Sequence, residues 1–376
     1  MKMPCDDASL PEFETPEGPR VTIDGTDYDW FRGNGYLGLY GHPDVLRASV
    51  DATLRYGMRL RDRRPVGCHP CVLELERQAR RTFACDAVAL FNSGYAAVAG
   101  LASGLHDRCD AVFLDDESHF SLADAMALLD KPLIRFAHRD ADDLKRKLRS
   151  QLRPGQRPLV ASDGIFPISG TLAPVPDYVE ALETYPGASL LLDDAHAAGV
   201  LGKNGRGILE HFGLEGAGRF SCATLSKAFG SFGGLVAGER GLVEDIRRRS
   251  GAFRGSALPP PGVVAASAAA LALARRRPRR RRRLVANLAR VRRGLHGMGL
   301  AVDPDSPSPI ICLDRRNPFN LKAAARRFFD EKRIGVFCLE GGYPSTPVGG
   351  ALVFTVFANH SRRQIDRLLE AFRQLC

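Results

Sequence analysis

The sequence predicts an α/β protein: a large, mostly parallel β-sheet with helices on both faces, followed by a smaller α+β domain. Three observations predict this fold. Between residues 46 and 250, short apolar runs alternate with helical patterns, as in successive βα units. Several of these runs end in Asp, Ser or Gly, as strands do at the ligand-binding edge of an open sheet. The length of 376 residues and the 44% hydrophobic content suit a globular protein.

The chain divides into three predicted parts. Residues 1–45 are rich in Gly, Pro and Asp and predict an N-terminal arm with a hairpin that starts at Val21–Ile23 and turns at Asp24-Gly25. Residues 46–255 form the predicted large domain. Its seven strands are expected at Ala87–Phe91, Ala111–Leu114, Leu133–Phe136, Pro158–Ser162, Ser189–Leu192, Cys222–Leu225 and Gly234–Ala237.

The proline run Pro259–Pro261 interrupts this pattern and places a domain boundary near residue 255. The predicted small domain therefore covers residues 256–376. It begins with an Ala-rich helix at Val263–Leu273. Its other elements are expected to be strands at Ile310–Leu313, Gly335–Cys338 and Leu352–Phe357, and helices at Leu321–Glu331 and Arg362–Leu375.

The positive charge of the chain is local. The formal net charge is +10, but the stretch Arg275–Arg293 holds eleven Arg and no acid, so the remainder carries 10 − 11 = −1. This distribution argues against a nucleic-acid-binding protein. Following an Ala-rich helix, the Arg-rich run is expected to be a solvated helix face, with a nucleic-acid- or phosphate-binding patch as the alternative.

The cysteines predict a cytoplasmic protein with reduced thiols. There are nine, an odd number, and no secretory leader precedes them. Cys68-His69-Pro70-Cys71 lacks a second pair at a suitable spacing, so no metal site is expected. No membrane span is expected either, because the longest apolar run, Val263–Ala274, has 12 residues and about 20 are needed.

A strand run that ends in acids is the first candidate for chemistry. Ser189–Leu192 is followed by Asp193, Asp194 and, three residues after Asp193, His196. A carboxylate at a buried strand end needs a cation, and a protonated pyridine nitrogen would serve. Such a carboxylate lets pyridoxal phosphate act as an electron sink. A metal-ligand pair or a helix cap is the alternative for this motif.

A lysine among small residues is the second candidate. Lys227 follows the strand Cys222–Leu225 and precedes Gly230 and Gly233. A partly desolvated amine of lowered pKa is suited to bond covalently to an aldehyde. Thr224, three residues earlier, offers a hydroxyl to a phosphate. Taken alone, Ser-Lys in a glycine-rich loop is a weak signal.

Two further strand ends carry polar residues. Ser93-Gly94-Tyr95 opens a helix after the strand Ala87–Phe91, and helix-start amides hold anions. His119 follows the strand Ala111–Leu114, and its imidazole could stack on a planar cofactor. The alternatives are an ordinary strand-to-helix turn and polar packing.

The order of these motifs resembles the α-oxoamine synthase family of pyridoxal-phosphate (PLP)-dependent enzymes of fold type I. That family includes 8-amino-7-oxononanoate synthase, 2-amino-3-ketobutyrate CoA ligase and serine palmitoyltransferase. The resemblance begins at Asn34-Gly35-Tyr36-Leu37-Gly38-Leu39 and covers nearly the whole chain. Its most specific segments are Ser93–Tyr95, Asp193–His196, Gly199–Gly202, Gly205–Gly207, Thr224–Gly230 and Ala257–Pro260.

The resemblance implies a role for each motif residue. Lys227 is then the residue that bonds to the cofactor and later transfers protons. Asp193 pairs with the pyridine nitrogen, His196 with the phenolic oxygen, and His119 stacks over the ring. The phosphate-binding residues implied are Ser93, Gly94, Tyr95 and Thr224. The family is a homodimer with active sites at the subunit interface, so Ser256 is expected to reach the neighbouring subunit's phosphate.

The sequence departs from the family on the substrate side. Family members carry an arginine that clamps the amino acid's carboxylate, but the corresponding stretch Pro347–Thr355 has none. Losing this charge-assisted pair costs about 1.5 to 3 kcal/mol. Either Arg63 or Arg254 substitutes, or the substrate presents another group there. Asn34 is a further candidate for substrate binding.

The resemblance, with its departures on the substrate side, implies a PLP-dependent acyltransferase of a divergent, biosynthetic branch. It would condense an amino acid or related amine with an acyl thioester, on CoA or a carrier protein, and release carbon dioxide to give an α-amino ketone. Aldol or retro-aldol chemistry, transamination and β/γ-replacement on the same scaffold are the alternatives. A non-catalytic partner subunit is less favoured, because such subunits usually lack the lysine found here at position 227.

Overall fold

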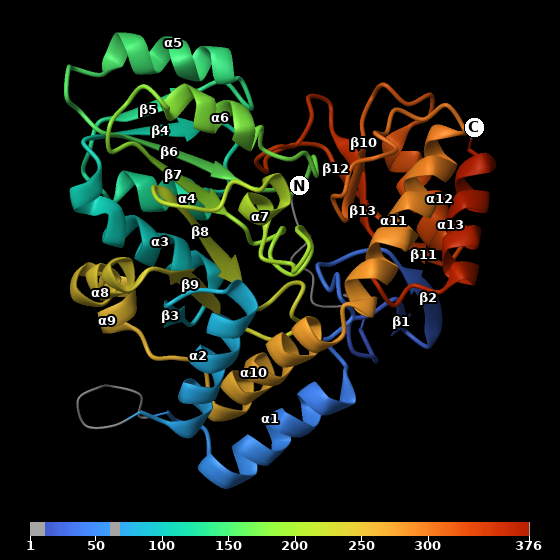
Figure 1. Ribbon diagram of the computed structural model, residues 1–376. Coiled ribbons are helices and arrows are strands. Elements are labelled where there is room, and N and C mark those ends of the chain that lie inside the picture. Colours follow the sequence, from blue (N-terminus) through green and yellow to red (C-terminus); the bar gives the residue numbers. More distant parts are fainter. Residues whose placement is uncertain (1–11, 61–67, 376) are drawn as a thin grey trace, which may run out of the picture.

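The computed structural model describes residues 12–60 and 68–375. Its main sheet has seven strands in the order β3-β9-β8-β7-β6-β4-β5 (Figure 1). β9 is antiparallel to both of its neighbours, and the other strand pairs are parallel. The predicted large, mostly parallel sheet is therefore confirmed. Its strands are β3 (Ala87–Phe91), β4 (Ala111–Asp115), β5 (Leu133–Phe136), β6 (Pro158–Asp163), β7 (Ser189–Asp193), β8 (Arg219–Thr224) and β9 (Gly234–Gly238).

Helices cover both faces of this sheet, because successive strand residues point to opposite sides. Phe113 of β4 belongs to one buried cluster, and its neighbours Val112 and Leu114 belong to the other. One face packs against α3 (Gly94–Leu105), α4 (Phe120–Ala127) and α8 (Arg240–Arg249). The other face packs against α2 (Pro70–Phe83), α5 (Ala141–Gln151), α6 (Val175–Leu182), α7 (Ile208–Phe212) and α10 (Pro261–Arg276).

Most of the other helices lie beyond those that pack directly on the main sheet. α1 (Pro43–Tyr56) packs on α10, which also contacts α2 (Figure 1). The remaining helices are the 3₁₀ turn η1 (His106–Arg108), α9 (Gly251–Gly255), α11 (Arg279–His296), α12 (Leu321–Asp330) and α13 (Arg362–Arg373). Within the described residues, no helix is both long and apolar enough to cross a membrane.

The C-terminal part holds a second sheet, β10-β13-β12, which is antiparallel throughout. Its strands are β10 (Ile310–Leu313), β12 (Phe337–Leu339) and β13 (Ala351–Thr355). The single strand predicted at Gly335–Cys338 is wrong, because β11 (Ile334–Gly335) and β12 belong to different sheets. Gly335 lies against the Trp30 ring, where a Cβ atom would be 2.1 Å from a ring carbon. After Gly335 the chain passes from the sheet of β2 to β13.

The N-terminal hairpin joins the C-terminal part. β1 (Arg20–Ile23) and β2 (Thr26–Trp30) are connected by Asp24 and Gly25, both at positive φ, as a two-residue type I′ turn requires. β2 also pairs in parallel with β11. The structure thus places strands that are distant in sequence side by side. The domain boundaries near residues 45 and 255 remain predictions.

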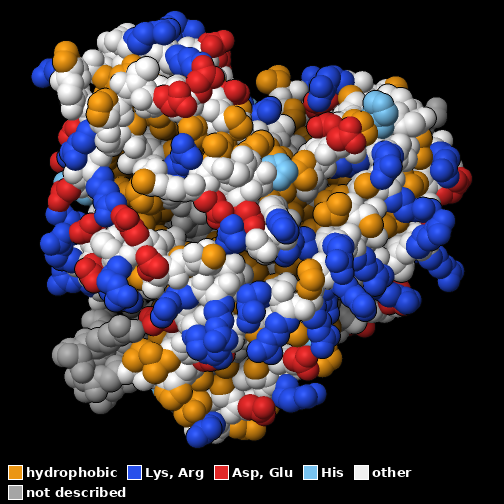
Figure 2. Space-filling model, viewed as in Figure 1, with side chains coloured by type: hydrophobic (Ala, Val, Ile, Leu, Met, Phe, Trp, Pro, Cys, Tyr) orange, Lys and Arg blue, Asp and Glu red, His pale blue; other side chains and the backbone are white. Residues whose placement is uncertain are grey.

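The Arg-rich run is only partly a solvated face. Lys and Arg side chains gather over α10 and α11 on the face seen in Figure 2. Arg292, however, is buried and donates to the carbonyls of Asp303, Ser308 and Ile310 at 2.8 to 3.1 Å. Arg280 donates to two carbonyls at 3.0 and 3.1 Å, those of Leu37 and Gly38. The run therefore also holds backbone segments together, which its composition alone did not indicate.

Candidate active site

A cavity of about 380 Å³ lies where β6, β7 and β8 end and the C-terminal sheet approaches them. Parallel strands place their carboxyl ends at one edge, which explains why residues from distant segments meet here. We call it the site cavity. Its lining includes eight of the predicted site residues: Asn34, Gly94, Tyr95, His119, Asp193, His196, Thr224 and Lys227.

Lys227 ends a chain of hydrogen bonds inside the site cavity. Its Nζ lies 2.7 Å from Nε2 of His196, whose Nδ1 lies 2.7 Å from the Tyr36 hydroxyl. Tyr36 in turn donates to Oδ1 of Asn34 at 3.1 Å. With Lys227 as the donor to Nε2, His196 is neutral and carries its proton on Nδ1. Each contact in this chain then joins one donor to one acceptor.

Burial controls the charges of this chain. It lowers the pKa of the Lys227 amine, and nearby Asp193 and Asp163 partly oppose that shift. Burial also lowers the pKa of His196 well below its usual value, and Lys227 adds to the effect. Lys227 is therefore easier to deprotonate than a surface lysine and better suited to act as a nucleophile or base.

Two carboxyl groups stand side by side at the strand ends. Asp193 of β7 is the register partner of Asp163 of β6, and both are buried. Burial raises the pKa of Asp193, while Lys227 lowers it. Burial and Asp193 together raise the pKa of Asp163 well above its usual value. The pair therefore favours one ionised and one protonated carboxyl group.

The start of α3 and the end of β8 form one wall of the site cavity. Ser93 caps α3 by accepting a hydrogen bond from Ala96 N at 3.1 Å, and it does not line the cavity. A Cβ atom on Gly94 would lie 3.0 Å from Cβ of Thr224, so glycine permits the close approach of these two elements. The first amides of α3 have no acceptor within the helix. This wall can therefore hold an anion.

His119 is fixed from three sides. Its backbone N donates to Asp163 Oδ2 at 2.8 Å, and its Nδ1 lies 2.7 Å from the Ser121 hydroxyl. Its Nε2 lies 2.9 Å from the hydroxyl of Tyr343, which comes from the C-terminal part. Burial lowers the pKa of His119, and Asp193 opposes the shift. A neutral imidazole at the mouth of the cavity is the result.

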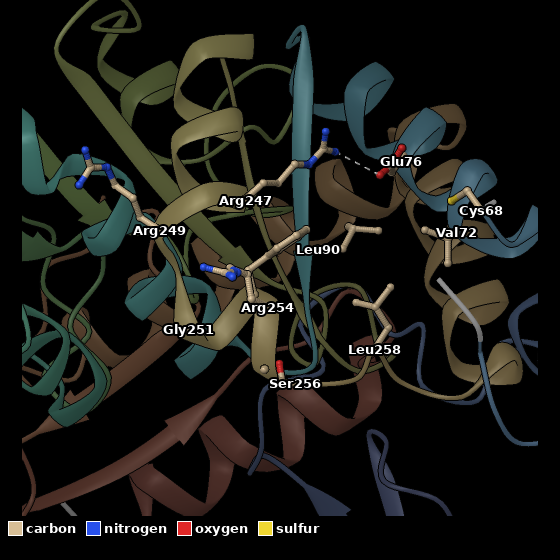
Figure 3. Close-up of a pocket in the computed structure, with 12 residues that line it drawn as sticks. Cys68, Val72, Glu76, Leu90, Arg247, Arg249, Gly251, Arg254, Ser256 and Leu258 are labelled. Atoms are coloured by element: carbon tan, nitrogen blue, oxygen red, sulfur yellow. Dashed lines mark ion pairs between the residues drawn. The ribbon is translucent and has the colours of Figure 1, made fainter. Parts of the chain in front are cut away.

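The remaining predicted residues lie elsewhere. Arg254 and Ser256 line a second cavity of about 620 Å³ (Figure 3), between α2, β3 and the α8–α9 segment. In this cavity Arg247 pairs with Glu76 at 3.6 Å. The structure thus does not bring Arg254 or Ser256 into the site cavity of the same chain. Arg63 lies outside the described residues.

Comparisons with known proteins identify the family of the chain. The model of the family "Aminotransferase class I and II" matches residues 71–372. The chain is 33% identical to 8-amino-7-oxononanoate synthase 1 of Bacillus velezensis, over 97% of this chain and 92% of that protein. It is 35% identical to 8-amino-7-oxononanoate synthase of Symbiobacterium thermophilum, over 97% and 93%. The chain belongs to the α-oxoamine synthase family.

Solved structures of this family have the same fold. A serine palmitoyltransferase from S. paucimobilis, solved with a bound PLP–myriocin aldimine, superposes with a TM-score of 0.87. Its sequence is 27% identical, and the match covers 97% of this chain and 92% of that one. A second serine palmitoyltransferase structure, with a PLP internal aldimine, matches equally well. The α-oxoamine synthases are PLP-dependent transferases, so the predicted family, fold type and enzyme class are confirmed.

Three polar residues of this α-oxoamine synthase's site were not assigned by sequence analysis: Asp163 and Tyr343 line the site cavity, and Tyr36 contacts His196. Asp163 carried a usable signal, because an acid ends an apolar strand there just as Asp193 does, but the predicted strand stopped at Ser162. Tyr36 was noticed only as part of a family segment. Tyr343 gave no local signal, because its contact with His119 joins residues 224 apart. Within the described residues, no cluster of His, Cys, Asp and Glu is arranged to hold a metal ion.

Proposed function

We propose that this protein is a PLP-dependent acyltransferase that condenses an amino acid or related amine with an acyl thioester to give an α-amino ketone. One observation carries the proposal: the Lys227 amine and the Asp193 carboxyl group line the same cavity. A PLP ring has an aldehyde on one side and a nitrogen on another, and these two side chains match those groups chemically. The names of the relatives support the condensation with a thioester.

The residues present fit PLP. Asp193 is a buried carboxyl group whose charge interacts with Lys227, and a protonated pyridine nitrogen beside it would further stabilise its ionised form. The α3 start and Thr224 offer amides and a hydroxyl to a phosphate. His119, held by Asp163 and Tyr343, would lie against the ring, and His196 would face the phenolic oxygen. Bound there, PLP would draw electrons from the carbon that bears the substrate's amino group.

The protein's own groups then perform the proton transfers. Lys227 Nζ, with its lowered pKa, accepts the proton from that carbon and returns it later. His196 holds Lys227 in place through the 2.7 Å contact, and Tyr36 fixes the His196 ring. Burial of these groups excludes bulk water and strengthens each electrostatic contact.

A second candidate is other PLP-dependent chemistry on this scaffold: aldol or retro-aldol reaction, transamination or β/γ-replacement. The observation that favours it is the C-terminal wall of the site cavity. Val353 and Thr355 of β13 line that wall, where the family's arginine segment is expected. The choice of thioester carrier, CoA or carrier protein, belongs to this proposal as well.

We also propose a homodimer. α1 exposes an apolar stripe at every fourth residue, namely Leu46, Val50, Leu54 and Met58 just after the helix. Hydrophobic side chains gather over α1 at the lower edge of Figure 2. Such a contiguous stripe on a soluble chain is typical of a protein interface. A cytoplasmic location is proposed from the seven described cysteines, which are all free thiols.

The test is a Lys227→Ala variant compared with the unmodified protein. Borohydride treatment followed by peptide mass spectrometry should find PLP attached to Lys227 in the unmodified protein. The variant should lack that adduct and the visible absorption of the linked cofactor. Candidate amines are then supplied with and without acyl thioester. A new ketone product only with both confirms condensation, whereas conversion of PLP to pyridoxamine phosphate indicates transamination.

A further inference from the structure

The C-terminal wall of the site cavity is mostly apolar. Val353 of β13, Ile310 of β10 and Phe337 of β12 line it, and the facing side is lined by Pro167 and Ile168. Val353 is buried within a strand paired on both sides, to β10 and β12. Its position is therefore set by the sheet and not by a movable loop. A substrate group that points at this wall would contact apolar side chains.

The charges around the site cavity also oppose an anionic substrate group. Among its described lining residues, Lys227, His119 and His196 are the basic side chains, and Asp163 and Asp193 are acidic. Burial lowers the pKa of both histidines, so they are neutral near pH 7. Lys227, whose pKa is lowered by burial, must be neutral to accept the proton of the amino carbon, so it does not supply a positive charge. Among the described lining residues, a substrate carboxylate would then find no cation, and burying it unpaired is costly.

We propose that the amine substrate carries an uncharged group on its amino carbon in place of a free carboxylate. It would be an alkylamine or an amino acid whose carboxyl group is an ester, amide or thioester. This inference rests on the proposed function and deepens it. Val353 is then a specificity-determining residue, because its side chain contacts the uncharged group.

The reaction that follows balances without loss of carbon dioxide. The amino carbon gives its proton to Lys227 Nζ and forms a bond to the thioester carbonyl carbon. The carbon–sulfur bond breaks, and the thiolate leaves with the electron pair and takes up a proton. No oxidant or reductant is needed. The product is an α-amino ketone that still carries the uncharged group.

The experiment compares matched amines with the full chain loaded with PLP. L-alanine, L-alaninamide and isopropylamine are titrated, and dissociation constants are read from the change in the bound cofactor's absorption and from the shift in Tm. The two amines that lack a carboxylate should bind at least about tenfold more tightly than L-alanine, the ratio expected for one missing charge-assisted contact. The third amine distinguishes an alkylamine from a masked amino acid.

Val353→Arg supplies the missing cation and should reverse the preference, so that L-alanine binds at least about tenfold more tightly than it does to the unmodified protein. Val348→Arg is the matched control, because Val348 lies on the same segment and is 97% exposed. It should leave all three constants unchanged. If Val353→Arg does not fold, the titrations of the unmodified protein still decide the question.

A PLP-loaded protein that binds L-alanine more tightly than L-alaninamide overturns this inference alone. Loss of that binding in Arg63→Ala or Arg254→Ala would identify the cation responsible. A protein that takes up no PLP overturns the proposed function, and this inference with it. The two failures are therefore distinguishable.

Discussion

At the scale of single residues, the paired carboxyl groups give the site cavity its charge pattern. Asp163 and Asp193 are register partners on adjacent strands, so both cannot be ionised without strong repulsion in a buried place. The pKa of Asp163 is raised further above its usual value than that of Asp193. Asp163 is therefore the protonated member, and Asp193 is the one available to a cofactor cation.

This assignment predicts different outcomes for two isosteric changes. Asp163→Asn should retain PLP, because the amide oxygen still accepts from His119 N and the replaced group was neutral. Asp193→Asn should weaken PLP binding at least about tenfold, since a charge-assisted hydrogen bond is lost. Cofactor content after dialysis measures both. Equal loss of PLP from the two variants would contradict the assignment.

The same assignment predicts a change in pH dependence. Because the folded-state pKa of Asp163 is raised above the unfolded value of 3.8, the unfolded chain loses this proton first as pH rises. Stability contributed by the protonated group is present below 3.8 and declines as pH rises toward the folded pKa. Asp163→Asn lacks this decline, so its unfolding free energy relative to the unmodified protein should increase with pH over that window.

For single residues, the sequence indicated which side chains line the cavity better than it indicated their contacts with distant residues. Asp193 and Lys227 were predicted from acids and amines at strand ends, and the structure places both in one cavity. Tyr343 could not be predicted, because its contact depends on how the C-terminal part approaches α4. The positions of Ser256 and Arg254 could not be predicted for the same reason. Their place beside α2 in the second cavity is set by long-range packing that no local pattern records.

At the scale of elements, the apolar strands of the main sheet were predicted almost residue by residue. Buried parallel strands are short, continuous apolar runs. β4, β6 and β7 are buried throughout, begin where the sequence indicates and end one residue later. The failure at Gly335–Cys338 has a different cause. β11 and β12 have only two and three residues, so each is too short for a period-2 pattern. β11 pairs with β2 and β12 with β13, and these partners are distant in sequence.

Helix α11 carries both a buried and an exposed arginine. Arg292 is buried, and burial lowers its pKa to about 10. It stays bound to three backbone carbonyls that connect α11 to the segment leading into β10. Its neighbour Arg293 is exposed. Helical periodicity explains this difference, since adjacent residues on a helix face different directions.

Replacing these two arginines should therefore have unequal effects. Arg292→Ala removes hydrogen bonds from a charged group and leaves buried carbonyls unsatisfied, so it should lower the free energy of unfolding by about 2 to 3 kcal/mol. Arg293→Ala is the matched control and should change it by less than about 0.5 kcal/mol. Urea unfolding of both variants measures the difference. Similar values for the two would show that Arg292 is not a structural clamp.

At the scale of the whole molecule, the N- and C-terminal segments close on each other around the site cavity. Thr355 of β13 donates to the Phe31 carbonyl at 2.8 Å, and Ala358 donates to the Tyr36 carbonyl at 2.7 Å. Tyr36 contacts His196, and Arg280 of α11 holds the carbonyls of the next two residues. Substrate-side groups and cofactor-side groups are therefore positioned by one continuous set of contacts.

The remaining question at this scale is what covers α1. Leu54 is 82% exposed in the middle of the apolar stripe, so a single chain leaves this surface in water. Leu54→Glu should place a charge inside a dimer interface and shift the protein toward monomer, which sedimentation velocity can measure at micromolar concentration. Leu128→Glu is the matched control, because Leu128 is 77% exposed at the end of α4, away from the stripe, and it should leave the assembly unchanged. An unmodified protein that sediments as a monomer would contradict the proposed dimer. A Leu54→Glu variant that remains a dimer would instead place the interface on another surface.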